Sequence, residues 1–409
     1  MQDKHTVLKM PAYLPDFSCI GPECEDHCCY GWDIIVDKVS YRRYGKLPST
    51  GLGKRIRKVM RLIRKDPSDA RYARFVRSSE VCPFLTPSRL CRIQAELGQD
   101  LLPDTCAIFP RHLRARQAWI DLSASMACPE IARRALENPK GIEILEVRHD
   151  PATAGMLRGI EPKQPVEVEA SGLALRVFVL SLLKDRTHEL WRRVMALGFL
   201  LEAVGFSDAA SGTGTLTLLL DEFAHRVDSG EWMDRMENAP VMSGLQLQLV
   251  KRLHDEMAPW VRVKTFRDCA AECLAGLHYT GTQPFTDEIG RRYDLAFKQA
   301  YEPFFDHYAF MLENYLVNHV LHHDLGFHQG RRLFDDYVMM VLNFAMLKTY
   351  LIGMAARHGE RMNAAMVTRL IYSFTKAVEP DARFRDYALR LLAQSGCADM
   401  MHLAVLIKN

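Results

Sequence analysis

The chain has little net charge, no leader-like N-terminus, and no uninterrupted apolar run across residues 173–205. Its 53 Lys and Arg residues nearly balance 50 Asp and Glu residues over 409 positions, so we expect no nucleic-acid partner. The first residues, MQDKHTVLKMPAY, lack the apolar stretch of a secretory signal. The most apolar stretch, residues 173–205, is interrupted by charges such as Arg176, Lys184 and Asp185, which predicts a soluble helix. These absences predict a cytoplasmic protein.

Familiar cofactor signatures are also missing. The Gly-rich stretch SGTGTLTLLLDEF, residues 211–223, has no convincing strand before it and therefore predicts a linker that caps a helix. The CxxxCxxC pattern of radical S-adenosylmethionine enzymes begins at Cys24 and Cys28 but fails at Gly31. The paired CxxC knuckles of zinc ribbons are absent as well. Sequence motifs therefore assign no cofactor-binding residues and no catalytic residues.

What the chain does contain is a dense group of cysteines in its N-terminal third. Reducing conditions in the cytosol disfavour disulfides, so metal binding is the favoured explanation, ahead of buried free thiols and of disulfides in an exported form. Zinc and iron-sulfur clusters both need several converging thiolates. Eight of the 11 cysteines lie within the first 128 residues: Cys19, Cys24, Cys28, Cys29, Cys82, Cys91, Cys106 and Cys128.

The spacing gives a provisional ranking of metal ligands. Cys24 and Cys28 are four residues apart and would share one face of a helical turn, whereas the adjacent Cys28 and Cys29 must point in different directions. Three thiols from one short segment then need a distant fourth, and an iron-sulfur cluster is favoured over zinc. The predicted ligands, in order of preference, are Cys19, Cys24, Cys28 and Cys106, then Cys29 and Cys91. Cys82 and Cys128 are predicted to be structural thiols.

Patterning along the chain predicts a mainly α protein in two parts. A compact cysteine-rich module that binds a cluster or metal is expected over residues 1–140, a proline-containing linker over 141–170, and a multi-helix domain over 171–409. Helical periodicity recurs near residues 216, 245, 290, 310, 340, 365 and 385. Strand signals are confined to the short runs WDIIVD, RARQAWIDL and VEVEA.

Three further features allow two interpretations each. His319 and His323 lie one helical turn apart and could ligate a metal, although a polar helix face is the favoured interpretation. Cys269 and Cys273 are likewise four residues apart and are expected in a helical core. Residues 54–65, KRIRKVMRLIRK, predict a basic amphipathic helix. This helix could lie on anionic lipid, which would place the protein peripherally at the inner membrane, or on RNA or an acidic protein. Packing on its own domain is favoured.

Several spaced motifs together carry a resemblance to a known family. The run FSCIGPECEDHCCYGWDIIVD, followed by Tyr41 and Tyr44 and then by CPFL, LCRI, TCAIFPR and ACPEIAR, resembles the flagellin lysine-N-methylase family. ENYLVNHVL, residues 313–321, also resembles it, and the N-terminal part is similar to CxxCxxCC zinc- or iron-chelating domains. The resemblance implies a methyltransferase that uses S-adenosylmethionine and a cysteine-bound [4Fe-4S] cluster to methylate surface lysines of flagellin.

Lysine methylation imposes one chemical requirement that the sequence does not locate. A free lysine, with a pKa of about 10.4, is protonated at neutral pH and has no lone pair for attack. A desolvated pocket or a nearby base must supply the neutral amine. The alternative to an enzyme is a non-enzymatic scaffold whose cluster or zinc ion holds together a partner-binding helical domain.

Overall fold

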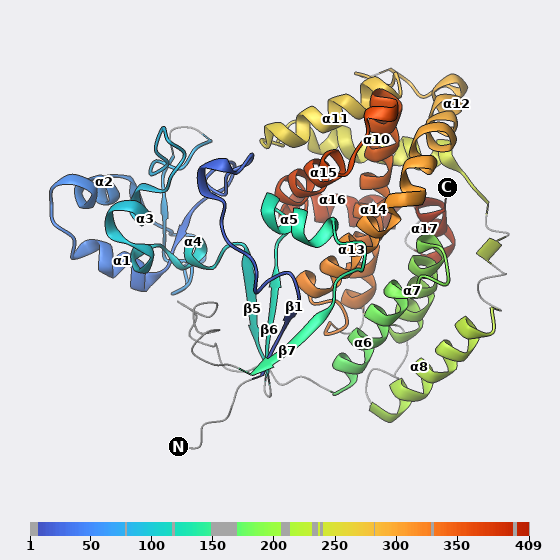
Figure 1. Cartoon of the computed structure of the whole chain (residues 1–409), viewed down its shortest axis with the longest axis horizontal. Coiled ribbons are helices and arrows are strands. Elements are labelled where there is room, and N and C mark those ends of the chain that lie inside the picture. Colours follow the sequence, from blue (N-terminus) through green and yellow to red (C-terminus); the bar gives the residue numbers. More distant parts are fainter. Residues whose placement is uncertain are drawn as a thin grey trace. The chain divides into compact units, whose positions relative to one another are not determined.

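A computed structural model describes the protein (Figure 1). Most contacts between residues fall within one of two compact units. Unit 1 comprises Met1–Ile131 and Ile144–Val166, and unit 2 comprises Ala132–Glu143 and Glu167–Asn409. The structure describes residues 7–77, 80–116, 119–148, 170–205, 213–230, 236–237, 240–281, 283–328, 331–395 and 399–408.

A four-stranded sheet forms one part of unit 1, in the order β5-β6-β1-β7. β1 is central, parallel to β6 and antiparallel to β7. Its alternating side chains place Leu8 and Met10 in a core shared with Ile120 and Leu122 of β6. The strands are β1 (Val7–Pro11), β5 (Arg111–Ala115), β6 (Trp119–Ala124) and β7 (Ile144–Arg148).

The remainder of unit 1 combines short helices with a three-stranded antiparallel sheet, ordered β2-β4-β3. Asp37 caps the first of these helices by accepting a hydrogen bond from the Ser40 amide at 2.7 Å. Tyr44, Phe75 and Phe84 are fully buried at its centre. The elements are β2 (Ile35–Val36), α1 (Lys38–Gly45), α2 (Gly51–Val59), β3 (Met60–Leu62), β4 (Ala73–Phe75), α3 (Arg92–Leu97) and α4 (Asp104–Ile108). The helix α5 (Pro129–Leu136) begins in unit 1 and continues into unit 2.

The prediction of a basic helix over residues 54–65 is wrong beyond Val59. The helix α2 ends there, and Met60–Leu62 continue as strand β3, paired with β4. Ile56 is fully buried in the core of unit 1, and Val59 and Met60 pack against that core. The apolar stripe is therefore used for packing, and exposed Lys54, Arg55 and Lys58 form a basic surface without an apolar face.

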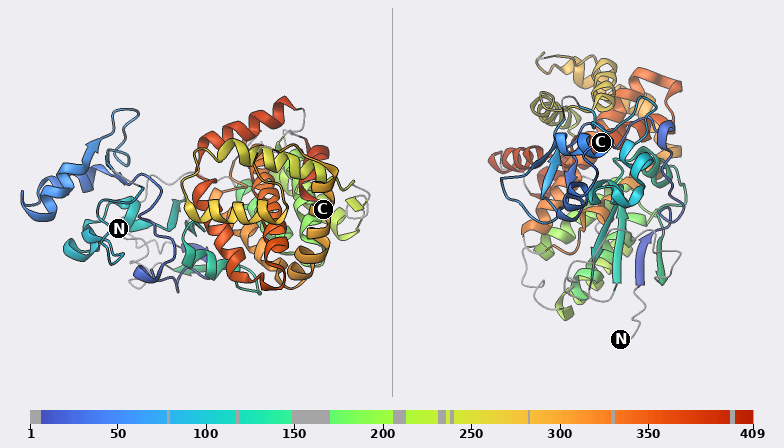
Figure 2. Two further views of the ribbon diagram at one scale, coloured as in Figure 1. Left: turned by 90° about the horizontal axis from the view of Figure 1, so that it is seen from above. Right: turned by 90° about the vertical axis from the view of Figure 1, so that its left-hand side faces the viewer.

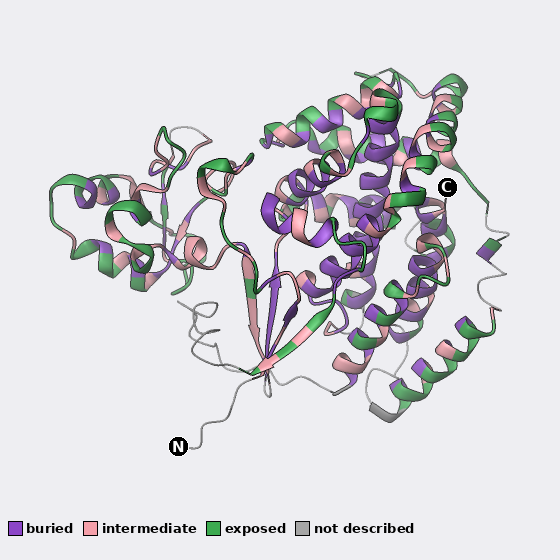
Figure 3. Cartoon of the chain, in the orientation of Figure 1, coloured by how far each residue is buried: buried purple, intermediate pink, exposed green. Residues whose placement is uncertain are grey.

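Unit 2 is built almost entirely from helices arranged around α14, whose residues are mostly buried (Figures 2 and 3). Several helices begin at polar caps: Thr286, Asn363, Asp381 and Asp399 each accept a backbone amide. The helices are α6 (Ala170–Lys184), α7 (Leu190–Gly205), α8 (Thr213–Asp228), α10 (Ser243–Met257), α11 (Lys264–Gly276), α12 (Asp287–Ala296), α13 (Glu302–His323), α14 (Arg331–His358), α15 (Ala364–Ala377), α16 (Ala382–Gln394) and α17 (Met400–Ile407).

A close helix contact in unit 2 joins α11 to α14 through two glycines. A Cβ atom on Gly353 would lie 2.5 Å from the Cys273 sulfur, and one on Gly276 would lie 2.0 Å from the Gly353 carbonyl oxygen. Only hydrogen atoms fit at these positions, so the two backbones approach closely. Cys269 and Cys273 are buried on α11, which confirms the prediction that they are core residues.

The structure confirms the mainly α class and helices at all seven positions where helical periodicity recurs. It also places strands within the runs WDIIVD and RARQAWIDL. The VEVEA run falls at residues 166–170, of which 166–169 lie outside the described part of the chain. The linker predicted over 141–170 contains a strand, because Ile144–Arg148 pair with β1 as β7. The pattern of polar and apolar residues in this segment could not reveal the pairing, because the pairing depends on a partner strand near the N-terminus.

One helical stretch in the described part of the chain, Arg332–Arg361, is long and apolar enough to cross a membrane. Its apolar window is entirely buried inside unit 2. Burial on all sides is typical of the central helix of a globular domain.

Candidate metal centre and polar sites

The N-terminal cysteines lie on loops and helix starts of unit 1. Cys19, Cys24, Cys28 and Cys29 belong to the segment between β1 and β2. The other four come from distant positions: Cys82 follows β4, Cys91 is the N-cap of α3, Cys106 lies in α4, and Cys128 immediately precedes α5.

Backbone hydrogen bonds bring two of these loops together. The Cys82 amide donates to the Cys29 carbonyl at 2.8 Å, and Tyr30 forms an antiparallel bridge with Val81. A second bridge joins Leu85 to Cys91. The contacts of Cys29 and Tyr30 hold residues more than 50 positions apart in the sequence beside each other, next to the core that contains Phe84.

Five thiols form an inner thiol group: Cys28, Cys29, Cys82, Cys91 and Cys106. Cys29 is hydrogen-bonded through its thiol to Cys28 and Cys82, which raises the pKa of Cys29. The same contact lowers the pKa of Cys82. Cys91 and Cys106 interact electrostatically with Cys28 and Cys82, and burial is the main cause of their raised pKa values.

The remaining three thiols, Cys19, Cys24 and Cys128, form an outer thiol group that meets the inner group at Cys28. Burial raises the pKa of Cys24 to about 11, with smaller contributions from Cys19 and Cys28. Burial likewise raises the pKa of Cys128 to about 12, with smaller contributions from Cys24 and Cys28. Cys28 therefore interacts with thiols of both groups.

Buried side chains hold the inner thiol group in place. The Tyr44 hydroxyl donates to the Leu101 carbonyl at 2.5 Å, and its pKa is raised by burial and by the neighbouring Cys106, Cys91 and Cys82. Asp37 accepts the backbone amide of Asp104 at 3.0 Å, which ties the start of α1 to the start of α4 and hence to Cys106.

All six cysteines predicted as ligands lie in these two groups, but the structure distributes them differently from the sequence ranking. Cys28, Cys29, Cys91 and Cys106 belong to the inner group, whereas Cys19 and Cys24 belong to the outer one. Cys82, which the sequence ranked as structural, lies within the inner group. Its CPFL motif was the available signal, although nothing in its spacing indicated contact with Cys29. The choice of ligands stays a prediction.

The donor set fits a thiolate-bound metal or cluster. Soft ligands select zinc or iron-sulfur clusters, and the inner group alone holds one thiol more than the four that close a single site. Burial and mutual repulsion keep most of these thiols protonated in the free protein. Binding a cation there would release those protons, which makes binding dependent on pH.

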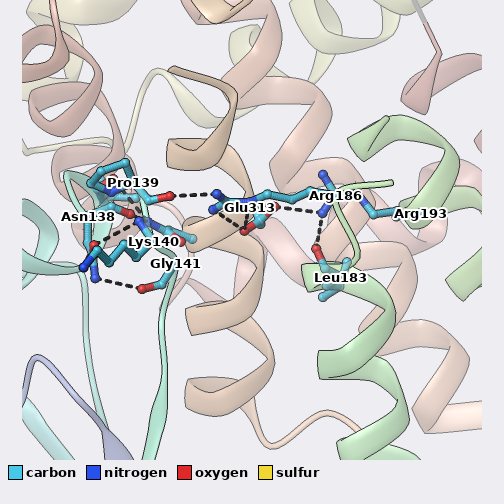
Figure 4. Close-up of polar contacts among 10 residues, drawn as sticks. Asn138, Pro139, Lys140, Gly141, Leu183, Arg186, Arg193 and Glu313 are labelled. Carbon is cyan, nitrogen blue, oxygen red and sulfur yellow. Dashed lines mark hydrogen bonds and ion pairs between the residues drawn. The ribbon is translucent and has the colours of Figure 1, made fainter. Parts of the chain in front are cut away.

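A second polar site lies inside unit 2, at the start of the ENYLVNHVL motif on α13 (Figure 4). Glu313 is 3% exposed and accepts hydrogen bonds from both Arg186, at 2.8 to 3.1 Å, and Arg193, at 2.8 Å. Arg186 also donates to the Pro139 carbonyl at 2.7 Å. The adjacent Asn314 donates to the carbonyls of Leu136 and Asn138.

This Glu313 network joins three segments of unit 2. It fastens residues 132–143 and the connection between α6 and α7 to α13. The carboxylate is fully occupied by two guanidinium groups, so it is not available as a base. We interpret the network as a structural joint, which explains why this motif is polar although it is buried.

A pocket of about 520 Å³ lies between α7 and α8. Its apolar walls come from Phe199, Leu219 and Phe223, and Glu202 and Glu222 contribute carboxylates. Burial raises the pKa of Glu202, whereas Glu222 pairs with Arg226 at 2.5 Å. Sequence patterns did not indicate this pocket, because its two carboxylates lie on different helices.

Comparison with known proteins gives a consistent family assignment. A family model described as the FliB lysine N-methylase C-terminal domain matches residues 176–406. Proteins named lysine-N-methylase from Salmonella choleraesuis and Salmonella typhimurium are each 29% identical to the chain over 252 residues. That match covers 60% of this chain and 61% of each relative.

A third relative, named flagellar biosynthetic protein FliU, comes from Salmonella muenchen. It is 33% identical over 143 residues, which cover 35% of this chain and 85% of that protein. No solved structure matches the chain significantly.

Proposed function

The chain belongs to the FliB lysine N-methylase family, and from this premise we propose that it is a protein lysine N-methyltransferase that modifies surface lysines of flagellin. The family match over residues 176–406 carries the proposal. The flagellar name of the relative from Salmonella muenchen supports flagellin as the substrate. S-adenosylmethionine is the proposed methyl donor.

The pocket between α7 and α8 suits the side chain of a target lysine. Phe199, Leu219 and Phe223 can pack against the aliphatic stem, and aromatic faces attract an ammonium group. Glu202, whose pKa is raised by burial, is placed to accept a proton from that ammonium. In the net reaction the amine loses this proton and gains a methyl group, and the sulfonium of the donor becomes a thioether.

We assign the proposed [4Fe-4S] cluster to the inner thiol group of unit 1. Four of its five thiols would hold the iron atoms, and Tyr44 and the Asp37 contact to α4 would fix their positions. When bound, such a cluster would supply one-electron chemistry. Zinc is the alternative occupant.

A methylation assay on the full chain tests the proposal. Protein reconstituted anaerobically with iron and sulfide is incubated with purified flagellin and S-adenosylmethionine, and modified lysines are identified by mass spectrometry. We expect methylated lysines, and a strong loss of turnover in Glu202→Gln. Asp221→Asn on α8, which removes an exposed carboxylate that does not line the pocket, should retain activity.

The outcomes separate the enzyme from the scaffold. A cluster-loaded protein that binds flagellin but transfers no methyl group would contradict the enzymatic proposal and support the scaffold. Equal activity of Glu202→Gln and the wild type would remove Glu202 from the mechanism while leaving the methyltransferase proposal intact.

A further inference from the structure

Two histidines and a glutamate converge within unit 2. His319 and His323 lie one turn apart on α13, and Glu379 follows the C-terminal end of α15. One candidate ligand atom from each of the three residues lies within 4.8 Å of the others. The sequence places the histidines on one helical face but gives no indication of Glu379, which is 56 residues further along the chain.

The individual distances leave room for an ion between the three side chains. His323 Nε2 lies 3.3 Å from Glu379 Oε2, and His319 Nδ1 lies 3.9 Å from Glu379 Oε1. The distance between His319 and Glu379 is longer than a hydrogen bond. The two imidazole rings lie with their centroids 4.1 Å apart. All three groups therefore face one another without closing into a fully hydrogen-bonded cluster.

An unsatisfied buried atom points to the same place. His319 is 5% exposed, and its Nδ1 atom is buried without a hydrogen-bond partner. Leaving a buried polar atom unpaired costs about 1 to 3 kcal/mol. A cation between the histidines and Glu379 would satisfy this nitrogen by accepting its lone pair.

The glutamate is oriented by hydrogen bonds of its own. Tyr315 donates its hydroxyl to Glu379 Oε1 at 2.7 Å, and Thr375 donates to the same oxygen at 3.4 Å. Outer hydrogen bonds of this kind fix the orientation of carboxylate ligands at metal sites. Asp336, which also acts electrostatically on His319, is already bound by His328 and Arg385.

We propose that His319, His323 and Glu379 bind one divalent transition-metal ion such as zinc. Two imidazoles and one carboxylate form a known zinc ligand set, which leaves a fourth coordination position open. His319 and Glu379 are 5% and 6% exposed, whereas His323 is 36% exposed and provides access from solvent. The ion would join α13 to the end of α15. This proposal depends on unit 2 alone and not on the proposed methyltransferase activity.

Cobalt titration of the full chain can test the site despite the N-terminal thiols. Co²⁺ bound by cysteine shows an intense thiolate charge-transfer band, whereas Co²⁺ bound by nitrogen and oxygen shows only weaker d-d bands. We expect His323→Gln, a change at a partly exposed position, to lose one equivalent of Co²⁺. The wild-type-minus-variant difference spectrum should contain d-d bands alone. His307→Gln, at an exposed position of the same helix, is the matched control and should bind as the wild type does.

A graded variant sharpens the test. Tyr315→Phe removes the donor to Glu379 but no ligand, so we expect its affinity for Co²⁺ to fall by about 10 to 100-fold. Unchanged stoichiometry and affinity in His323→Gln would overturn the proposal, because this variant keeps the buried residues intact. A difference spectrum with a thiolate band would also overturn it, since the lost ion would then belong to the cysteines.

Discussion

Unit 1 consists of strands and helices that are all short, whereas unit 2 packs long helices around α14. In unit 1, eight thiols lie on the loops and in the short helices. In unit 2, the two cysteines on α11 are buried core residues beside the glycines that allow the close crossing of α11 and α14. The difference indicates two means of stabilisation. Unit 2 relies on apolar burial, and we expect unit 1 to rely additionally on what its thiols bind.

The largest expected effect comes from removing the bound metal or cluster. We expect metal removal from the anaerobically purified full chain to increase hydrogen exchange of α3 and α4 by at least about 100-fold, because structural metal binding contributes folding free energy directly. Exchange in α14 should not change. Hydrogen exchange measured by mass spectrometry checks both. Equal protection of α3 and α4 with and without metal would mean that unit 1 is stable on its own apolar core.

A polar substitution should damage unit 2 in a different way. Glu313→Gln removes the charge that balances Arg193, which is 5% exposed, and breaking a buried pair costs about 3 to 5 kcal/mol. Arg186 is 45% exposed and contributes little to this figure because solvent screens it. Urea unfolding followed by circular dichroism measures the decrease in the free energy of unfolding. Glu360→Gln, at an exposed position, is the control, and an equally small effect of both changes would contradict a structural role for the network.

The buried Lys348 predicts a pH dependence of unit 2. Burial lowers the pKa of Lys348 to about 7, while its pKa in the unfolded chain is about 10.4. Between these values the unfolded state binds more protons, so the free energy of unfolding rises with pH by up to about 1.4 kcal/mol per unit. From pH 8 to pH 10 we expect Lys348 to increase the free energy of unfolding by about 2 to 3 kcal/mol. This increase should be absent in Lys348→Met. If the free energy of unfolding depends on pH in the same way in the wild type and in Lys348→Met, the lowered pKa of Lys348 would be contradicted.

The smallest effect is expected at the basic surface of α2. Because its apolar stripe is buried in unit 1, attraction to anionic vesicles can come only from charges, at about 1 kcal/mol for each residue near the lipid. Lys54→Glu with Lys58→Glu should weaken co-sedimentation with such vesicles at low salt and leave methylation of soluble flagellin unchanged. Loss of methylation without a change in vesicle binding would assign this surface to the substrate instead.

Local patterns predicted the helices of unit 2, because apolar periodicity directly reflects which face is buried. They failed where a partner from elsewhere in the chain decides the structure. Met60–Leu62 leave the helical path because β4 pairs with them, and Ile144–Arg148 become a strand because β1 is available. The contact of Cys82 with Cys29 and the approach of Glu379 to His323 likewise join distant segments. No spacing rule within either segment contains that information.

The assignment of the cluster to the inner thiol group can be tested by measuring the iron and acid-labile sulfide of the anaerobically reconstituted full chain. We expect equal amounts of iron and acid-labile sulfide in the wild type, and loss of both in Cys106→Ser, a variant of the inner thiol group. Cys128→Ser, in the outer thiol group, should retain them. Stoichiometric zinc without sulfide, or full cluster content in Cys106→Ser, would contradict the assignment of the cluster to the inner thiol group.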